Sequence, residues 1–202
     1  MTWSALILAA GAAERMGRAK VVLSVGSQSM VGSVVSSARL AGLDDVVVVT
    51  GYHGDVVADE IEGTARIVQN PDASRGNMSS LVTGLDAVPD SDGVVVLLGD
   101  MPLVSHEIIR SVRDTLASGG ATACWVEYTD ADDRPVMGHP VGLAAAAFPA
   151  VRRLTGRKAL WKYLEGLPDV DVARVEVEEP KPLDVNTADD YEQLTRQLRG
   201  SD

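Results

Sequence analysis

Short apolar runs alternate along this chain with segments whose apolar residues have the spacing of a helix. The runs are nearly continuous, as expected for strands buried on both faces of a parallel sheet. They occupy residues 4–9, 46–50, 65–68, 94–98, 121–128 and 173–177, and the helical segments occupy residues 30–40, 54–61, 79–87, 105–116, 158–164 and 188 onward. This alternation predicts an α/β fold with a doubly wound, mostly parallel sheet.

Length and composition limit the class of protein. The 202 residues suffice for one α/β domain with a buried core, spanning residues 1–202. The net charge of −11 argues against nonspecific binding to nucleic acid or to an anionic membrane. No apolar run approaches the ~18 to 20 residues that span a bilayer, and no signal peptide is recognisable, so we expect a cytoplasmic protein. The single cysteine, Cys124, lies in an apolar stretch and is expected in the core.

The stretch that follows the first predicted strand carries positive charge in an otherwise acidic chain. Gly11 and its small neighbours let the backbone approach a ligand closely, and successive N–H groups there can surround an anion. Arg15, Arg18 and Lys20 add three cations. This combination predicts a phosphate site. The alternative for Arg15 and Lys20 is an exposed pair on a solvated loop.

Three candidate segments directly follow predicted strands: the Gly11 loop, the Gly76 loop and Asp100. We expect them to meet at one edge of the sheet, beyond the carboxyl ends of the strands. A carboxylate such as that of Asp100 suits a hard cation like Mg²⁺, and the alternative is a turn aspartate. The motifs of dinucleotide oxidoreductases, P-loop hydrolases and α/β-hydrolases are absent from the sequence, and its histidines lack metal-ligand spacing.

Six short motifs follow one another along almost the whole chain. They are Leu8-Ala9-Ala10-Gly11 with Arg15-Met16-Gly17 and Lys20, then Gly76-Asn77-Met78-Ser79-Ser80-Leu81, Leu98-Gly99-Asp100-Met101-Pro102, Gly138-His139-Pro140-Val141, Thr155-Gly156 with Lys158, and Asp184-Val185-Asn186-Thr187. The first resembles the signature of nucleotidyltransferases that act on nucleoside triphosphates. The ordered set is similar to that of the molybdenum cofactor cytidylyltransferases, a MobA-like nucleoside triphosphate transferase family. The resemblance implies a Rossmann-like, GT-A-like nucleotidyltransferase domain.

For the nucleotide, the resemblance implies a binding half made mainly of residues 1–104. The backbone of Leu8, Ala9, Ala10 and Gly11 would lie against base and ribose, Arg15 and Lys20 would hold the triphosphate, and Gly76, Ser79 and Ser80 would recognise the base. Arg15, Lys20 and Asp100 would then be the catalytic residues, acting by positioning and by charge neutralisation. The two serines also suit a purely local role as caps of the helix that follows.

For the metal, the resemblance implies Mg²⁺ with Asp100 as its principal ligand. Asp184 and Asn186 would complete the metal site or contact the ribose. They lie two positions apart in an extended segment, so their side chains share one face. Many family members have Asp where this chain has Asn186, which leaves open which of the two binds the metal. The alternative for both is capping of the last helix.

For the acceptor, the resemblance implies a binding half made mainly of residues 105–202. His139, Pro140 and Lys158 would line the acceptor pocket. Arg157 departs from the family, where Asp is common between the glycine and the lysine. The alternatives are a turn histidine held by Pro140 and, for the basic residues 152–162, a solvated helix face.

The expected reaction transfers CMP from CTP to the phosphate of the molybdenum–molybdopterin cofactor and releases pyrophosphate. The Ala10 form of the first motif, together with the Gly76 loop, looks more like that of cytidylyltransferases than that of guanylyltransferases, which usually have Gly at this position, so the resemblance implies CTP rather than GTP. Two alternatives stay open. One is guanylyl or other nucleotidyl transfer to a different phosphorylated acceptor, such as phospholactate or a sugar phosphate. The other is a carrier that binds the cofactor and delivers it to a client molybdoenzyme.

Overall fold

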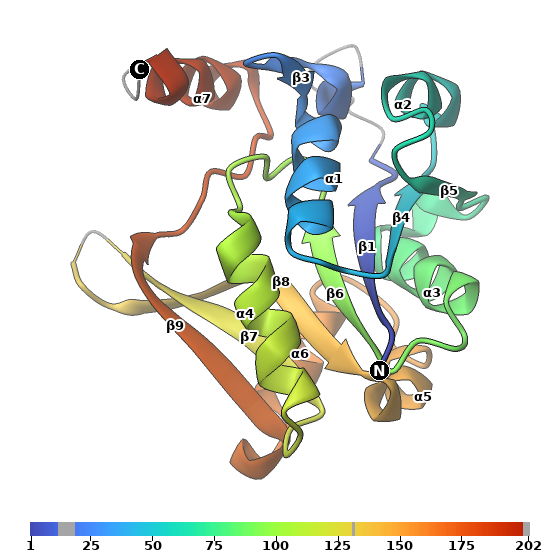
Figure 1. The fold of residues 1–202 in the computed structure, drawn as a ribbon, viewed down its shortest axis with the longest axis vertical. Coiled ribbons are helices and arrows are strands. Elements are labelled where there is room, and N and C mark those ends of the chain that lie inside the picture. Colours follow the sequence, from blue (N-terminus) through green and yellow to red (C-terminus); the bar gives the residue numbers. More distant parts are fainter. Residues whose placement is uncertain (12–18, 131, 200–202) are drawn as a thin grey trace.

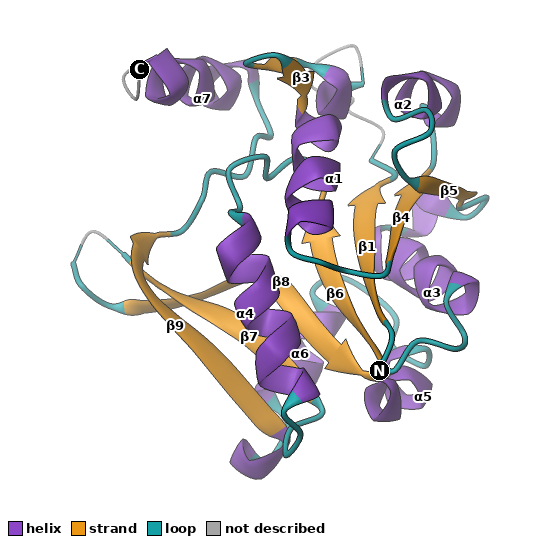
Figure 2. Ribbon diagram, in the orientation of Figure 1, coloured by secondary structure: helices purple, strands orange, loops and turns teal. Residues whose placement is uncertain are grey.

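A seven-stranded sheet forms the centre of the computed structural model, which describes residues 1–11, 19–130 and 132–199 (Figures 1 and 2). Its strand order is β5-β4-β1-β6-β8-β7-β9. The strands span Trp3–Ala9 for β1, Asp45–Thr50 for β4, Arg66–Gln69 for β5, Gly93–Leu98 for β6, Ala123–Thr129 for β7, Pro135–Ala144 for β8 and Val172–Pro180 for β9.

Parallel pairing dominates this sheet, as the sequence predicts. β1 pairs in parallel with β4 and β6, β4 with β5, and β7 with β9. β8 runs antiparallel to both of its neighbours, β6 and β7. β8 is longer than the apolar stretch around Val141 indicates, because it continues through Pro135, Gly138 and Pro140, which are poor strand formers.

Helices cover both faces of the sheet (Figure 1). On one face lie α1 (Met30–Leu40), α2 (Gly54–Glu60) and α4 (His106–Ala117); on the other lie α3 (Asn77–Ala87), α5 (Phe148–Val151) and α6 (Ala159–Glu165). The remaining elements are the hairpin of β2 (Ser24–Val25) and β3 (Gln28–Ser29), helix α7 (Ala188–Arg199), and 3-10 turns at Lys20–Val22 (η2), Ala73–Arg75 (η3), Ala145–Ala147 (η4) and Asp169–Asp171 (η5). This layering is the doubly wound arrangement that the alternation predicts.

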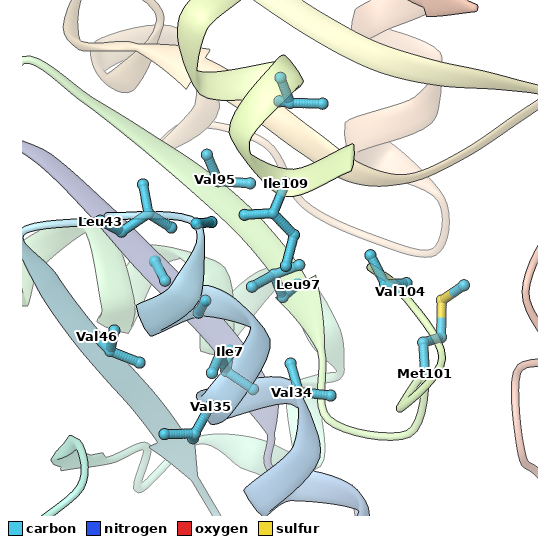
Figure 3. Packing of buried hydrophobic residues seen from close by; sticks show 14 of the residues in the cluster. Ile7, Val34, Val35, Leu43, Val46, Val95, Leu97, Met101, Val104 and Ile109 are labelled. Atoms are coloured by element: carbon cyan, nitrogen blue, oxygen red, sulfur yellow. The ribbon is translucent and has the colours of Figure 1, made fainter. Parts of the chain in front are cut away.

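The apolar runs form the two main layers of the core. Alternate residues of β1 point to opposite faces, so Ile7 packs with α1 and α4 while Leu6 packs with α3. Figure 3 shows Ile7 among Val34, Val35 and the other labelled residues of the first layer. Cys124 is fully buried in the same layer, as expected, and burial raises the pKa of its thiol to about 12. No helix in the described part of the chain is long and apolar enough to cross a membrane.

A third, smaller cluster fixes the C-terminal segment beside the N-terminal one. Leu194 of α7 and Val185 pack with Val25 of the β2–β3 hairpin. The hydroxyl of Tyr191 donates a hydrogen bond of 2.8 Å to the carbonyl of Ser24. Figure 1 shows α7, near the end of the chain, lying beside β3, which is near its beginning. This docking carries residues 184–186 to the carboxyl edge of the sheet.

Side chains cap α4 and α7, whereas the serines that were expected to cap α3 do not. Ser105 caps α4, and Thr187 caps α7 by accepting a hydrogen bond from the Asp190 amide. Neither Ser79 nor Ser80 caps α3, because that helix begins at Asn77 with Gly76 as its N-cap residue. Gly76 has a φ of 90°, a conformation open to glycine and strained for other residues. The helix therefore starts two residues earlier than the expected boundary.

Candidate functional site

The candidate site begins where β1 and β6 end side by side. Leu8 is in register with Leu98, and the Gly99 amide donates a hydrogen bond of 3.0 Å to the Leu8 carbonyl. A Cβ atom at Gly99 would lie only 3.2 Å from the Cβ of Ala9, so a small residue lets the two strand ends close up. β1 pairs with β4 on its other side, so the chain crosses from one side of β1 to the other here. Such a switch of strand order is where α/β sheets bind ligands.

Lys20 and Asp100 meet at this edge. The Nζ atom of Lys20 lies 2.6 Å from Oδ2 of Asp100 and donates a hydrogen bond of 2.9 Å to Oδ1 of Asn186. The side chains of Lys20 and Asp100 are only 15% and 18% exposed. Burial raises the pKa of the Asp100 carboxyl, the Lys20 ammonium opposes that rise and the Asp184 charge adds to it. Lys20, Asp100 and Asp184 thus interact electrostatically at a site where Lys20 and Asp100 are mostly shielded from solvent.

The C-terminal segment supplies the second wall of this cluster. The Val185 amide donates a hydrogen bond of 3.1 Å to the Asp100 carbonyl, which fixes Asp184 and Asn186 beside Asp100. Asp190 stabilises the turn, because its Oδ2 atom accepts hydrogen bonds of 2.8 Å from the amides of Asn186 and Thr187. These bonds lower the pKa of the Asp190 carboxyl. Asp190 is a positioning residue that the sequence analysis missed, although its place three residues after Thr187 fits a capping box.

The predicted metal residues, together with Lys20 and the backbone residues of the first motif, line one small cavity of about 200 Å³. Lys20, Asp100, Asp184 and Asn186 form its polar side. The lining also contains the predicted backbone residues of the first motif, which are Leu8, Ala9, Ala10 and Gly11, and it includes His53 at the start of α2. Arg15 belongs to residues 12–18, which lie outside the described part of the chain.

The oxygen atoms in this cavity fit a hard divalent cation. Asp100 and Asp184 offer carboxylates and Asn186 offers an amide oxygen, and Mg²⁺ prefers one or two carboxylates together with phosphate oxygens and water. Among the described residues there is no group of three or more histidines, cysteines, aspartates or glutamates that could hold a metal alone. A Mg²⁺ ion here would take its remaining ligands from water or phosphate oxygens, as it commonly does in proteins.

The Gly76 loop is built on a buried asparagine. Asn70, which follows β5 and is 2% exposed, donates hydrogen bonds of 2.9 Å and 3.0 Å to the hydroxyls of Ser79 and Ser80. Its side-chain oxygen accepts a third bond of 2.9 Å from the Asp72 amide. The Ser79 hydroxyl also donates to the Asp72 and Gly76 carbonyls. Both serine hydroxyls thus hold the shape of the loop. The sequence analysis did not identify Asn70, because no sequence motif marks a buried residue whose side chain supports a loop through hydrogen bonds.

A larger cavity of about 460 Å³ adjoins the first one and shares Leu8, Asn77 and Leu98 with it. Gly76, His139 and Lys158 line this larger cavity, whereas Ser79, Ser80 and Pro140 line neither of the two. Each cavity is lined by residues from both the 1–104 and the 105–202 half of the chain. Most of the predicted residues thus divide between two neighbouring compartments, a smaller one that contains Lys20 and two aspartates and a larger one with a mostly apolar wall and basic residues in its lining.

A bulge in β8 points His139 into the larger cavity. Val141 pairs with Trp125 and Gly138 with the next residue of β7, so His139 and Pro140 are left out of the ladder. The Nδ1 atom of His139 lies 3.4 Å from the Val96 carbonyl, and its ring meets the Trp161 ring edge-on with centroids 5.1 Å apart. Burial lowers the pKa of His139 to about 4, so the ring is neutral at physiological pH. Trp161 of α6 is a further wall residue that the sequence analysis did not single out.

Comparison with known proteins agrees with this geometry. The family model described as MobA-like NTP transferase domain matches residues 5–172. A crystal structure of the Rv0371c homolog from Mycobacterium sp. strain JC1 superposes with a TM-score of 0.86 at 31% identity, covering 99% of this chain and 98% of that one. A structure of Rv0371c from Mycobacterium tuberculosis H37Rv in complex with manganese gives 0.81 at 28% identity, covering 97% and 99%.

A curated relative extends beyond this chain. The bifunctional protein GlmU of Clostridioides difficile (strain 630) is 30% identical over 112 residues, which is 54% of this chain and 24% of GlmU. The matched part thus spans about a quarter of that relative. Together the family match, the fold and the site support an enzyme that transfers a nucleotidyl group. With the family model matched over most of its length, this chain belongs to the MobA-like NTP transferase domain family.

Proposed function

We propose that this protein is a Mg²⁺-dependent cytidylyltransferase that transfers CMP from CTP to the phosphate of the molybdenum–molybdopterin cofactor. The observation that carries the proposal is the cluster of Lys20, Asp100, Asp184 and Asn186 beside the backbone of residues 8–11. It joins a cation for the triphosphate to oxygen ligands for a metal at the edge of the sheet where ligands bind. A divalent metal there would neutralise charge on the phosphates.

In this reaction an oxygen of the acceptor phosphate attacks the α-phosphorus of CTP in line. The bond between the α-phosphorus and the bridging oxygen to the β-phosphate breaks, and pyrophosphate leaves. A phosphate nucleophile is already ionised at neutral pH, so the protein needs no general base. Lys20 neutralises charge that builds up on the α-phosphate and on the leaving pyrophosphate, and the fixed strand ends hold both reactants in place. Arg15 would assist Lys20 at the triphosphate.

The two compartments suggest how the substrates are divided. The small cavity suits the triphosphate and metal, with the backbone of Leu8, Ala9, Ala10 and Gly11 against base and ribose. The Gly76 loop would read the base through its backbone, and Ser79 and Ser80 would act by holding the loop in shape. The larger cavity suits the acceptor, with His139 and Lys158 in its wall and Pro140 next to His139 in the sequence. Residues 1–104 would thus serve mainly the nucleotide, and residues 105–202 mainly the acceptor.

Pyrophosphate release tests this proposal directly. The protein is given Mg²⁺, the molybdopterin cofactor and either CTP or GTP, and pyrophosphate is measured over time. Release with CTP alone supports the proposal. Release with GTP alone keeps the chemistry and overturns the choice of base. No release with either, while each nucleotide still binds, would point to a different phosphorylated acceptor or to a cofactor carrier in the cytoplasm that delivers to a molybdoenzyme.

A further inference from the structure

The larger cavity has an unusual set of polar side chains for a chain with a net charge of −11. Its charged lining residues are Arg75, Arg157 and Lys158, and the described lining contains no carboxylate. The smaller cavity, in contrast, contains two aspartates near Lys20. Three like charges around one cavity repel each other unless an anion lies between them. An anion bound in the larger cavity would therefore be stabilised by these three cations.

These three cations come from two separate loops of the chain. Arg75 ends the η3 turn just before α3, and Arg157 and Lys158 directly precede α6. Within the described part of the chain, the side chains of Arg157 and Lys158 take part in no hydrogen bond or ion pair. Arg75 has a loose contact of 3.7 Å with Asp72, and both of those side chains are more than half exposed. Such an exposed contact holds a side chain weakly, so all three cations can turn to a ligand.

The rest of the cavity wall limits the body of that ligand. Its apolar lining consists of Leu8, Met78, Leu81, Val96, Leu98, Leu160 and Trp161. Among the described lining residues, the uncharged polar groups of side chains are those of Asn77 and His139 and the indole N–H of Trp161. A body rich in hydroxyls would leave most of them without partners in this cavity, which costs free energy for each buried group. A flat ring with few hydroxyl groups would instead pack on the Trp161 ring and the aliphatic wall.

We propose that Arg75 and Arg157, together with Lys158, form a second anion-binding site, separate from Lys20, for the phosphate of an acceptor whose body is a flat ring with few hydroxyl groups. Arginine suits this role because its planar group binds two phosphate oxygens at once. The two cavities share Leu8, Asn77 and Leu98, so a phosphate held here lies next to the nucleotide site. Calling the ligand the acceptor rests on the proposed function. The anion site itself does not.

Binding of small probes to the whole protein tests the site without any turnover. Trp161 lines the cavity, whereas Trp3 and Trp125 are buried elsewhere in the core, so tryptophan emission reports on occupancy. The probes are phenyl phosphate, phenol and ribose 5-phosphate, which separate the roles of ring and anion. We expect phenyl phosphate to bind at least about tenfold more tightly than either of the others, and its signal to disappear in Trp161→Phe.

Charge variants then identify the residues. Arg157→Gln and Arg75→Gln should each weaken phenyl phosphate binding about tenfold. Arg153→Gln is the matched control, because it removes the same charge from an exposed position outside both cavities and should leave binding unchanged. Equal binding in Arg157→Gln, Arg75→Gln and Arg153→Gln would overturn the proposal, and so would tighter binding of ribose 5-phosphate than of phenyl phosphate.

The outcome separates this inference from the proposed function. If phenyl phosphate binds as expected but no pyrophosphate is released with CTP or GTP, the anion site stands and the transferase reaction with that acceptor fails. If transfer occurs but Arg157→Gln and Arg75→Gln change neither probe binding nor the KM of the acceptor, the reaction stands and this site fails. In an enzyme where both hold, the two variants should raise the acceptor KM and leave the KM of CTP unchanged.

Discussion

The ammonium nitrogen of Lys20 lies 2.6 Å from a carboxylate oxygen of Asp100 in this structure. Lys20 therefore serves as the cation that balances Asp100, the carboxylate that would bind the metal. A divalent ion on the same carboxylate has to replace this pairing, which leaves the ammonium to interact with phosphate oxygens. The contact predicts that metal binding and the release of Lys20 toward the triphosphate are coupled.

Lys20→Ala should have opposite effects on catalysis and on metal binding. Turnover should fall about 10²–10³-fold, because a preorganised charge at the transition state is lost. Mn²⁺ binding without nucleotide should become tighter, since a competitor for Asp100 is gone. Steady-state kinetics and electron paramagnetic resonance of free Mn²⁺ measure the two effects. Lys162→Ala, an exposed position on α6, is the control. Weaker Mn²⁺ binding in Lys20→Ala would contradict the competition between the two cations.

Asp100→Asn should abolish metal-dependent turnover while the protein stays folded. The change removes the charge that holds the metal and keeps the size of the side chain, so we expect a loss of at least about 10²-fold in kcat/KM. Circular dichroism checks the fold and pyrophosphate release checks the activity. Asp90→Asn removes a charge from an exposed position and should behave as the wild type. Retained activity in Asp100→Asn would refute the metal role of Asp100.

Asn70→Ala should change both stability and nucleotide binding. The variant leaves the hydroxyls of Ser79 and Ser80 and the Asp72 amide without their partner, which costs about 1–3 kcal/mol of unfolding free energy. Because the Gly76 loop loses its support, the KM of the nucleotide should rise more than kcat falls. Urea denaturation and steady-state kinetics measure these changes. Ser79→Ala removes part of the same network, so an effect larger than that of Asn70→Ala would contradict the central role of Asn70.

Docking of α7 should determine the affinity for metal. Leu194 is fully buried between α7 and the β2–β3 hairpin, so Leu194→Ala should cost about 2–5 kcal/mol and loosen residues 184–186 beside Asp100. Leu164→Ala, in the core layer under α6, should cost a similar amount. Mn²⁺ affinity, measured well below both melting temperatures, should fall only for Leu194→Ala. Equal affinity in the two variants would show that α7 does not position the metal residues.

His139 should make the stability of the protein depend on pH between about 6.5 and 4. Its pKa is lowered to about 4 in the folded state, from the ordinary value of 6.5, so the unfolded chain binds a proton more readily in this range. The contribution of the neutral ring is complete above pH 6.5 and is lost as the pH falls toward 4. Because His139 is only partly shielded at the cavity wall, we expect about 1–2 kcal/mol.

The comparison with His139→Gln isolates this effect. Both proteins lose stability as carboxylates titrate, but the difference in unfolding free energy between wild type and variant should shrink as the pH falls from 6.5 to 4. Val170→Ala, which alters an exposed side chain that does not titrate, should give a difference that is constant over this range. A constant difference for His139→Gln as well would mean that the ring is not held neutral in the cavity.

Local sequence patterns are enough to predict six of the seven strands of the main sheet and most helices. Continuous apolar runs such as that of β1 can only be buried on both faces, and a loop such as that after Leu98 must leave the sheet at a strand end. The order of strands and loops along the chain therefore assigns Lys20 and Asp100 to one edge of the sheet.

Long-range packing decides which side chains meet at that edge. The packing of Leu194 and Val185 against the β2–β3 hairpin helps to bring Asn186 to Lys20, and the bulge in β8 points His139 toward Trp161. The serines of the Gly76 loop, which suggested base recognition, are held by the buried Asn70. Contacts between residues far apart in sequence depend on how helices and strands pack against one another. A local sequence pattern contains no information about this packing.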